Sequence, residues 1–169
     1  MILPEYVTAK EVVRVCSEIG IDDWSKRTEA FVSTQEASTI LAIVNTEGMP
    51  IPLDNFRMGL EVALEHGTGF KDANVTNNHP ILTGKIVLAH LKETMDYYQR
   101  IDVAEREGDL LKAVLSGNVD KITSKYKKLL EAQKALNESL AEQLKQGVTD
   151  RTHFFDTRLS TPLTGVGHE

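Results

Sequence analysis

Apolar residues recur at helical spacing along most of the chain, and polar or glycine-containing segments separate the repeats. Thr8 followed by Glu11 is a capping-box pattern, and it predicts a helix over about 9–19 that ends at Gly20. The spacing places Cys16 on the apolar face of this helix, so it is expected to be a core residue rather than a reactive thiol. The apolar face comprises Val12, Val13, Cys16 and Ile19.

A second capping box opens the next helix. A short helical turn is expected around Trp24, and then Ser33 and Glu36 predict a helix over about 34–45. The β-branched run at 40–44 is also compatible with a buried strand, so both readings stay open for this segment.

Two helices separated by a polar loop follow. Asp54 can cap a helix over about 55–66, with Gly67 closing it. Pro80 suits the first turn of a helix and predicts one from there to about residue 107.

The last third of the chain predicts a long helix and an arm. Gly108 and the turn at 116–118 frame a short helix, and a long helix is expected over about 119–146. Residues 148–169 lack a sustained period, which predicts an extended C-terminal arm. The expected fold is therefore all-α, an irregular helical bundle with one long C-terminal helix and an extended arm. Apolar residues suited to bind neighbours are Ile122, Tyr126, Leu129, Leu136 and Leu140 in the helix, and Phe154, Phe155, Leu159 and Leu163 in the arm.

Acids and histidines on two predicted helices form a candidate metal site. Glu61 and Glu65 are one turn apart with His66 beside them, and His90 and Glu93 are three residues apart on the later helix. Antiparallel packing would let the two sets approach, and carboxylates with imidazoles could then bind Fe, Mn or Zn. The same residues also fit a buried polar network without metal, or two solvated helix faces.

Composition restricts the class of protein. Charged residues make up 26% of the chain and the formal net charge is −6, which opposes direct nucleic-acid binding because phosphates need a basic surface. A single cysteine allows no intrachain disulfide. No apolar run is long enough to span a membrane, and the N-terminus is not a secretory signal. A cytoplasmic protein is expected, not a secreted one, or a virion component if a bacteriophage encodes it.

Three linked motifs carry a resemblance to a known family. They are FRMGLEVALEHGT, NVTNNHPILTGKIVLAHLKE and DYY, all within residues 56–98. This segment resembles a domain-of-unknown-function family of bacteria and tailed bacteriophages. The resemblance implies a helical domain in a bacterial or phage setting and supplies no reaction. It suggests four parts: an N-terminal helical extension (1–50), a family-like helical core (51–108), a short helix plus the long helix (109–147), and the arm (148–169).

This chain departs from the family's pattern at several acids. Family members commonly have a glutamate where Ala63 stands, an aspartate near Asn78 or His79, and a proline where Met95 stands. If those acids serve a site, their loss favours a structural role for this member.

Two hypotheses of function follow. The first is a non-enzymatic structural or accessory protein that docks into a larger assembly, such as a bacteriophage virion, through protein partners or self-association of the long helix and arm. The absence of phosphate-loop, nucleophile-elbow and His-Glu-x-x-His motifs supports it. The alternative is a metal-binding helical protein or a metal-dependent enzyme. A peptide-binding adaptor is a third possibility, and an exposed apolar groove would distinguish it.

Overall fold

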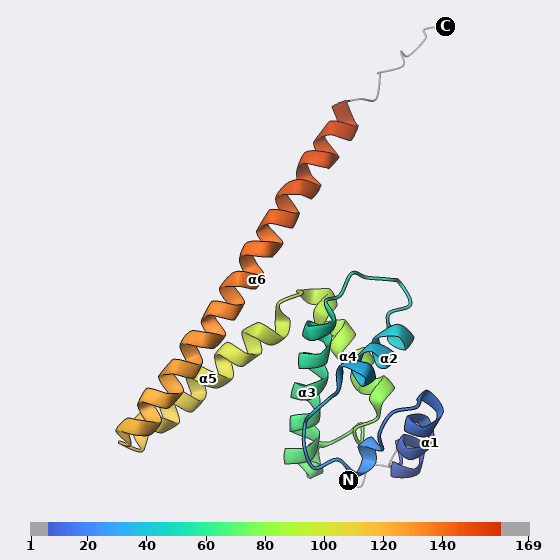
Figure 1. Ribbon diagram of the computed structural model, residues 1–169, viewed down its shortest axis with the longest axis vertical. Helices are drawn as coiled ribbons and strands as arrows, with labels where there is room; N and C mark the ends of the chain where they lie inside the picture. The colour runs from blue at the N-terminus through green and yellow to red at the C-terminus, as the bar shows by residue number, and fades with distance from the viewer. Residues whose placement is uncertain (1–6, 160–169) are drawn as a thin grey trace, which may run out of the picture. The chain divides into compact units, whose positions relative to one another are not determined.

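The computed structural model describes residues 7–159, with side chains described as far as Lys145, and this part of the chain contains α-helices, two 3₁₀ turns and no strand. The all-α prediction is confirmed. The chain forms two compact units, Met1–Ile101 (unit 1) and Asp102–Glu169 (unit 2). The elements are α1 (Ala9–Ile19), η1 (Trp24–Lys26), α2 (Thr34–Val44), α3 (Leu53–Gly69), η2 (Lys71–Ala73), α4 (Pro80–Glu93), α5 (Tyr97–Leu115) and α6 (Val119–Leu159) (Figure 1).

The first two helices begin where their capping patterns predict. The Thr8 side chain accepts a hydrogen bond from the Glu11 amide at 3.2 Å, and α1 ends at Gly20 in the left-handed conformation, with φ of 71°. At the start of α2, the Ser33 hydroxyl accepts from the Glu36 amide while the Glu36 carboxylate accepts from the Ser33 amide. The ambiguous run at 40–44 is helical, because Ile40 and Val44 lie one turn apart and both are buried.

Helix α3 differs from its prediction at both ends. It begins at Leu53, so Asp54 lies within the first turn and no side chain caps the helix. It also continues past Gly67 to Gly69. Gly67 is required for close packing instead of helix termination, since a Cβ there would lie 2.0 Å from the Asn78 Oδ1 atom.

The single helix predicted over 80–107 is wrong, because α4 ends at Glu93 and α5 starts at Tyr97. The break is stabilised by Asp96, whose fully buried carboxylate accepts hydrogen bonds from the Thr94 hydroxyl and from Arg100 at 2.8 Å. The Asn55 side-chain amide on α3 donates to the Met95 carbonyl at 3.0 Å. Gly108 lies inside α5, so the short helix expected after it is the last part of α5.

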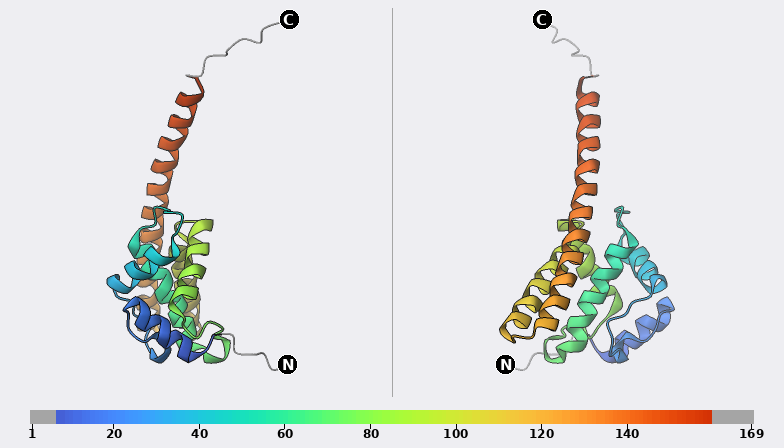
Figure 2. Two further views of the ribbon diagram at one scale, coloured as in Figure 1. Left: turned by 90° about the vertical axis from the view of Figure 1, so that its right-hand side faces the viewer. Right: turned by 60° about the vertical axis from the view of Figure 1, so that its left-hand side comes forward.

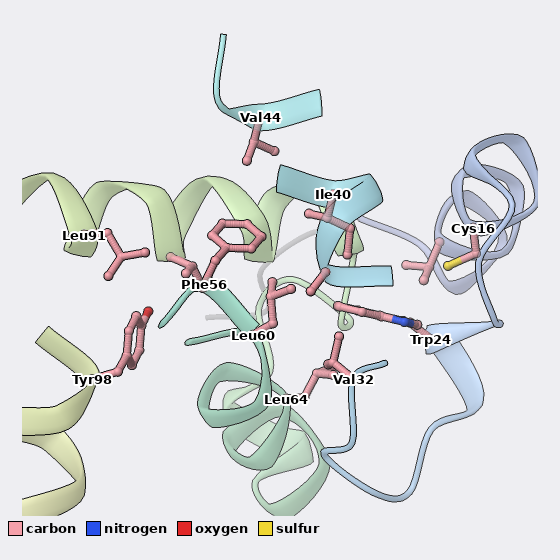
Figure 3. Packing of buried hydrophobic residues seen from close by; sticks show 13 residues of the cluster. Cys16, Trp24, Val32, Ile40, Val44, Phe56, Leu60, Leu64, Leu91 and Tyr98 are labelled. Carbon is pink, nitrogen blue, oxygen red and sulfur yellow. The ribbon is translucent and has the colours of Figure 1, made fainter. Parts of the chain in front are cut away.

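The core of unit 1 lies among α1, α2, α3 and α4 (Figure 3). Trp24, Phe56, Leu60 and Leu64 are fully buried, and Cys16 is 1% exposed, as predicted. Gly84 lets α4 approach α2 closely, since a Cβ at this position would lie 2.5 Å from the Ile40 Cγ2 atom. The largest members of this core are Trp24, Phe56, Ile40, Leu60, Leu64 and Leu91.

Unit 2 is a helical hairpin formed by the remainder of α5 and by α6, which lie side by side (Figures 1 and 2). Lys125 on α6 pairs with Asp109 on α5 at 2.6 Å. Helix α6 was predicted to end at Gly147, but it continues to Leu159 through the first part of the expected arm. Leu163 lies outside the described residues. Within the described residues, no helix is long and apolar enough to cross a membrane.

Candidate functional site: an aromatic cleft in unit 1

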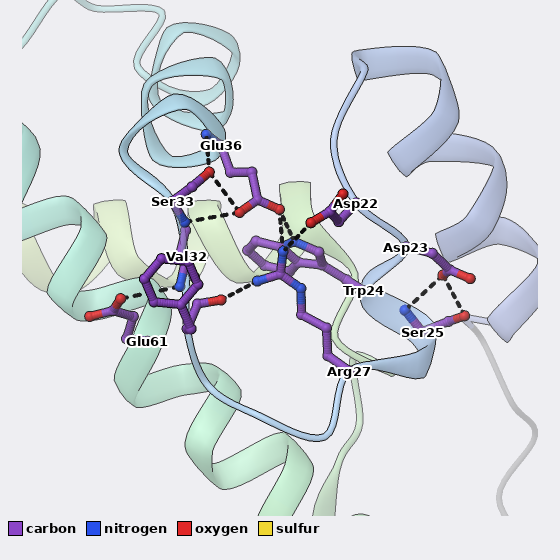
Figure 4. Close-up of polar contacts among 10 residues, drawn as sticks. Asp22, Asp23, Trp24, Ser25, Arg27, Val32, Ser33, Glu36 and Glu61 are labelled. Carbon is purple, nitrogen blue, oxygen red and sulfur yellow. Dashed lines mark hydrogen bonds and ion pairs between the residues drawn. The ribbon is translucent and has the colours of Figure 1, made fainter.

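The three glutamates of the predicted metal site point to different surroundings. The Glu61 Oε1 atom accepts hydrogen bonds from the Val32 amide at 3.1 Å and from Arg57 at 3.0 Å, so this carboxylate ties α3 to the segment before α2 (Figure 4). Glu65 and Glu93 are exposed. None of the three lines the cavity beside which the two histidines lie.

The two histidines do share a site. His66 and His90 both line a cavity of about 470 Å³ in unit 1. The His66 ring stacks on Phe70 with the ring centres 6.4 Å apart, and His90 contacts both tyrosines of the DYY motif. The structure therefore brings together two of the five predicted residues.

The predicted metal set is not assembled in the described residues, where no group of three or more His, Cys, Asp or Glu side chains is arranged to hold a metal ion. The reason is the 100° rotation between successive helical residues, which turns Glu61 toward Val32 while His66 lies at the cavity. Sequence spacing grouped Glu61 with Glu65 and His90 with Glu93, but Glu61 binds Val32 and Arg57 while Glu65 and Glu93 are exposed, because spacing does not show how each helix is rotated against its neighbours.

Four segments of unit 1 form the cavity, which we call the aromatic cleft: α3, residues 70–76, α4 and the start of α5. Apolar and aromatic side chains dominate its lining, and Phe70, Val75 and Ile86 are exposed there. Among the described residues, no Asp, Glu, Lys or Arg lines the cleft, although such residues make up 26% of the chain. Five rings line it, those of His66, Phe70, His90, Tyr97 and Tyr98.

Three of these rings form a fixed group. His90 stacks almost parallel on Tyr97, with ring centres 4.2 Å apart and an interplanar angle of 4°. The His90 Nδ1 atom is hydrogen-bonded to the Tyr98 hydroxyl at 3.0 Å. The Tyr98 ring in turn packs against Gly59, where a Cβ would lie 2.4 Å from the Tyr98 Cε2 atom. Burial, and then the neighbouring Tyr97, raise the pKa of Tyr98, so its hydroxyl is protonated at neutral pH.

The polar loop of the NVTNN motif closes one side of the cleft. The Asn74 side-chain amide donates to the Gly67 carbonyl at 3.0 Å and to the Asn78 Oδ1 atom at 2.9 Å. Asn77 and Asn78 adopt the left-handed conformation, with φ of 48° and 58°, which asparagine tolerates better than most residues. The asparagines of this motif therefore shape the loop.

His79 caps α4 from the end of the same loop. Its Nδ1 atom accepts hydrogen bonds from the amides of Ile81 at 3.2 Å and Leu82 at 3.4 Å. Burial lowers the pKa of His79, while the nearby Glu11 acts in the opposite direction. A neutral imidazole is required because only an unprotonated Nδ1 can accept these bonds.

A buried polar cluster that was not predicted lies beside the core (Figure 4). The Glu36 carboxylate accepts from the Trp24 indole at 3.0 Å, from the Ser33 amide and hydroxyl at 2.9 Å each, and from the Arg27 guanidinium. Arg27 also lies over the Trp24 ring, 5.0 Å from its centre. Burial opposes ionisation of Glu36, but these bonds and the Arg27 charge outweigh it and lower its pKa. The Ser33–Glu36 capping box was the only sequence signal for this cluster.

The predicted interaction residues of α6 differ in exposure. Leu129 is buried, Tyr126 is 52% exposed, and Ile122, Leu136 and Leu140 are half-buried. Phe154, Phe155 and Leu159 come after Lys145, the last residue whose side chain is described.

The chain belongs to a family of proteins of unknown function, DUF5661, whose family pattern matches residues 12–107. The match extends beyond the resemblance at 56–98 and includes most of α1 and all of α2, which the sequence placed in an N-terminal extension. Their packing explains this, because Val12, Cys16 and Ile40 belong to the same core as Phe56 and Leu60. No curated protein and no solved structure matches the chain.

Proposed function

We propose that the chain is a non-enzymatic accessory or structural protein that docks into a larger protein assembly through unit 2. The observation that carries this proposal is the apolar surface of that unit. A hairpin of two helices has few internal positions in which to bury side chains, and unit 2 leaves many large apolar residues exposed. They are Leu111, Val114, Leu115, Val119, Tyr126, Leu130 and Leu144.

Four of these residues gather at the turn between the helices. Val114 and Leu115 lie three and four residues after Leu111 on α5, so each is beside Leu111 on the helix surface, and Val119 follows directly after the turn. Leu115 and Val119 are 79% and 72% exposed. Covering these side chains by a protein partner would contribute about 25 cal/mol for each Å² of apolar surface removed from water, opposed by the entropy lost on association.

The length of α6 supports the same proposal. Lys125 on α6 lies opposite Asp109 on α5, and the two helices are antiparallel. Seven residues further along each helix, Asp102, the first residue of unit 2, therefore lies opposite Ala132. Helix α6 continues to Leu159, so among the described residues of unit 2 no helix lies beside its second half. A helix that projects in this way is suited to pair with a neighbouring subunit. The resemblance of residues 56–98 to a family of bacteria and tailed bacteriophages is the reason for proposing a phage particle as the assembly.

Size-exclusion chromatography with light scattering tests the proposal. The full-length chain is expected to self-associate, and the chain shortened to residues 1–147 is expected to associate more weakly. Leu115→Glu with Val119→Glu should reduce association further, whereas Ser124→Glu, which adds a charge at an exposed polar position of α6, should not. A monomeric full-length chain that is unchanged by the truncation would contradict the proposal.

A further inference from the structure

We infer that the aromatic cleft of unit 1 binds a small, uncharged, planar aromatic molecule. This goes beyond the proposed function, which uses unit 2 alone. A cavity of about 470 Å³ lies within the range of about 300–1,000 Å³ that is typical of small-molecule sites. Such sites are mostly apolar with a few polar groups, and the aromatic cleft has this composition.

The rings of the cleft favour a planar aromatic ligand over an aliphatic one. The chain has only ten Phe, Tyr and Trp residues, yet Phe70, Tyr97 and Tyr98 all line this cavity together with two imidazoles. Aromatic groups attract one another in stacked or edge-to-face contacts by about 0.5–1.5 kcal/mol beyond the burial of area. The parallel stack of His90 on Tyr97 and the edge contact of Tyr98 already have these geometries.

The charge pattern excludes an ionic ligand. None of the described residues that line the cleft is Asp, Glu, Lys or Arg, so neither a carboxylate nor an ammonium group would find a permanent counter-charge among them. An unpaired ion moved into such a cleft loses hydration without compensation. The ligand is therefore uncharged.

The two imidazoles supply polar contacts for one hydrogen-bonding group. The Nδ1 atom of His90 is already bonded to Tyr98, while its Nε2 atom and the His66 ring have no hydrogen bond to the described part of the chain. The Asn74 amide cannot serve this purpose, because it is bonded to Gly67 and Asn78. A ring that carries one N–H or O–H group, as indole does, matches this combination.

The test uses indole as the probe and two-dimensional ¹H–¹⁵N spectra of the full-length chain. Indole should shift the amides of Ala63, Ala73, Ile86 and Tyr97 with a Kd near or below about 1 mM, as expected of about nine non-hydrogen atoms. Cyclohexanol, neutral but not planar, and benzoate, planar but charged, should bind at least about tenfold more weakly. Equal shifts with indole and cyclohexanol, or no shift at the cleft, would overturn the inference.

Matched variants locate the site. Ala63 lines the cleft, and Ala63→Leu should fill part of it and weaken indole binding at least about tenfold. Ala42→Leu makes the same change on the exposed face of α2 and should leave the Kd unchanged. Ala73→Leu, on the exposed side of the cleft, serves the same purpose if Ala63→Leu does not fold. Indole binding that survives filling of the cleft would overturn the inference. None of these substitutions lies in unit 2, so none should change the oligomeric state, which tests the proposed function separately.

Discussion

At the scale of the residue, Glu36 is a buried charge held by several hydrogen bonds. Its carboxylate is bonded to the Trp24 indole, the Ser33 amide and the Arg27 guanidinium at once. Arg27 and Glu36 side chains are only 12% and 7% exposed, so water screens their attraction weakly. A buried ion pair of this kind often stabilises the fold no more than two apolar residues of the same size would. Removing one partner is nevertheless destabilising, because the charge of the other is left buried and poorly compensated.

We therefore predict that Glu36→Gln lowers the free energy of unfolding by about 2–4 kcal/mol, because the buried Arg27 charge loses its buried anionic partner and keeps only the exposed Asp22 carboxylate at 3.7 Å. Urea denaturation followed by circular dichroism measures this. The control is Glu29→Gln, which removes an exposed carboxylate from the same segment and should change stability by less than about 0.5 kcal/mol. Equal effects of the two substitutions would show that the cluster does not stabilise the fold.

His79 gives unit 1 a predictable dependence on pH. The pKa of His79 is lower in the folded chain than in the unfolded chain, where it is near 6.5. Between these two pKa values the unfolded chain therefore binds more protons than the folded chain. Stability is therefore full above about pH 6.5 and is lost as pH falls toward the lowered pKa. The loss should approach the value of a helix cap, about 1 kcal/mol, because the protonated ring cannot accept from Ile81 and Leu82.

Chemical denaturation between about pH 7.5 and pH 5 measures the effect. His79→Asn keeps a side chain that can cap the helix but does not titrate, so its profile should be flatter over this interval. The four other histidines are present in both chains, so the comparison isolates the residue at position 79. Identical profiles for the two chains would assign the pH dependence to other groups.

At the scale of the element, glycines with different surroundings separate packing from helix propensity. Gly84 lies where α4 meets α2, with Ile40 and Val44 in the space that a Cβ would take. Gly108 lies in the interior of α5, with nothing within 4 Å of that position. The two glycines share a helical environment and differ in the neighbouring side chains.

We predict that replacing glycine by alanine changes the stability of the chain in opposite directions at these two positions. Gly84→Ala should destabilise the chain by about 1–3 kcal/mol, since overpacking exceeds the gain in helix propensity. Gly108→Ala should stabilise it by up to about 1 kcal/mol, because the unfolded chain loses conformational freedom and no contact is strained. Thermal unfolding of both variants is the measurement. A stabilising Gly84→Ala would mean that α2 and α4 can separate at little cost.

Helix starts could be predicted from the sequence where the signal is local. Thr8 and Ser33 cap their helices through residues three positions away, and both starts were correct. The break at Thr94–Asp96 was missed because it contains neither proline nor glycine. It depends on Asn55, forty residues earlier, and on the burial of Asp96. The aromatic cleft was missed for the same reason: His90 on α4 and Tyr97 on α5 stack across the unpredicted helix break, and the packing of α3 and the 70–76 segment around them forms the cavity.

At the scale of the whole molecule, the two units differ in how their helices are stabilised. Among the described residues, the largest fully buried side chains, such as Trp24, Phe56 and Leu91, all belong to unit 1. The buried apolar residues of unit 2 among those described are Ala113, Leu129 and Ala132. Local stability follows buried apolar contacts, so the helices of unit 2 should open far more readily.

Hydrogen exchange followed by mass spectrometry checks this difference directly. Amides of α3 around Leu60–Leu64 should exchange only on global unfolding, whereas those of α6 at 138–145 should exchange at least about 100-fold faster in dilute protein, because an isolated helix is marginal in water. If neighbouring copies cover α6, its protection should rise with protein concentration while that of α3 stays constant. Strong protection of 138–145 that is independent of concentration would mean that α6 is stable without a partner, and the proposed docking through unit 2 would lose its physical basis.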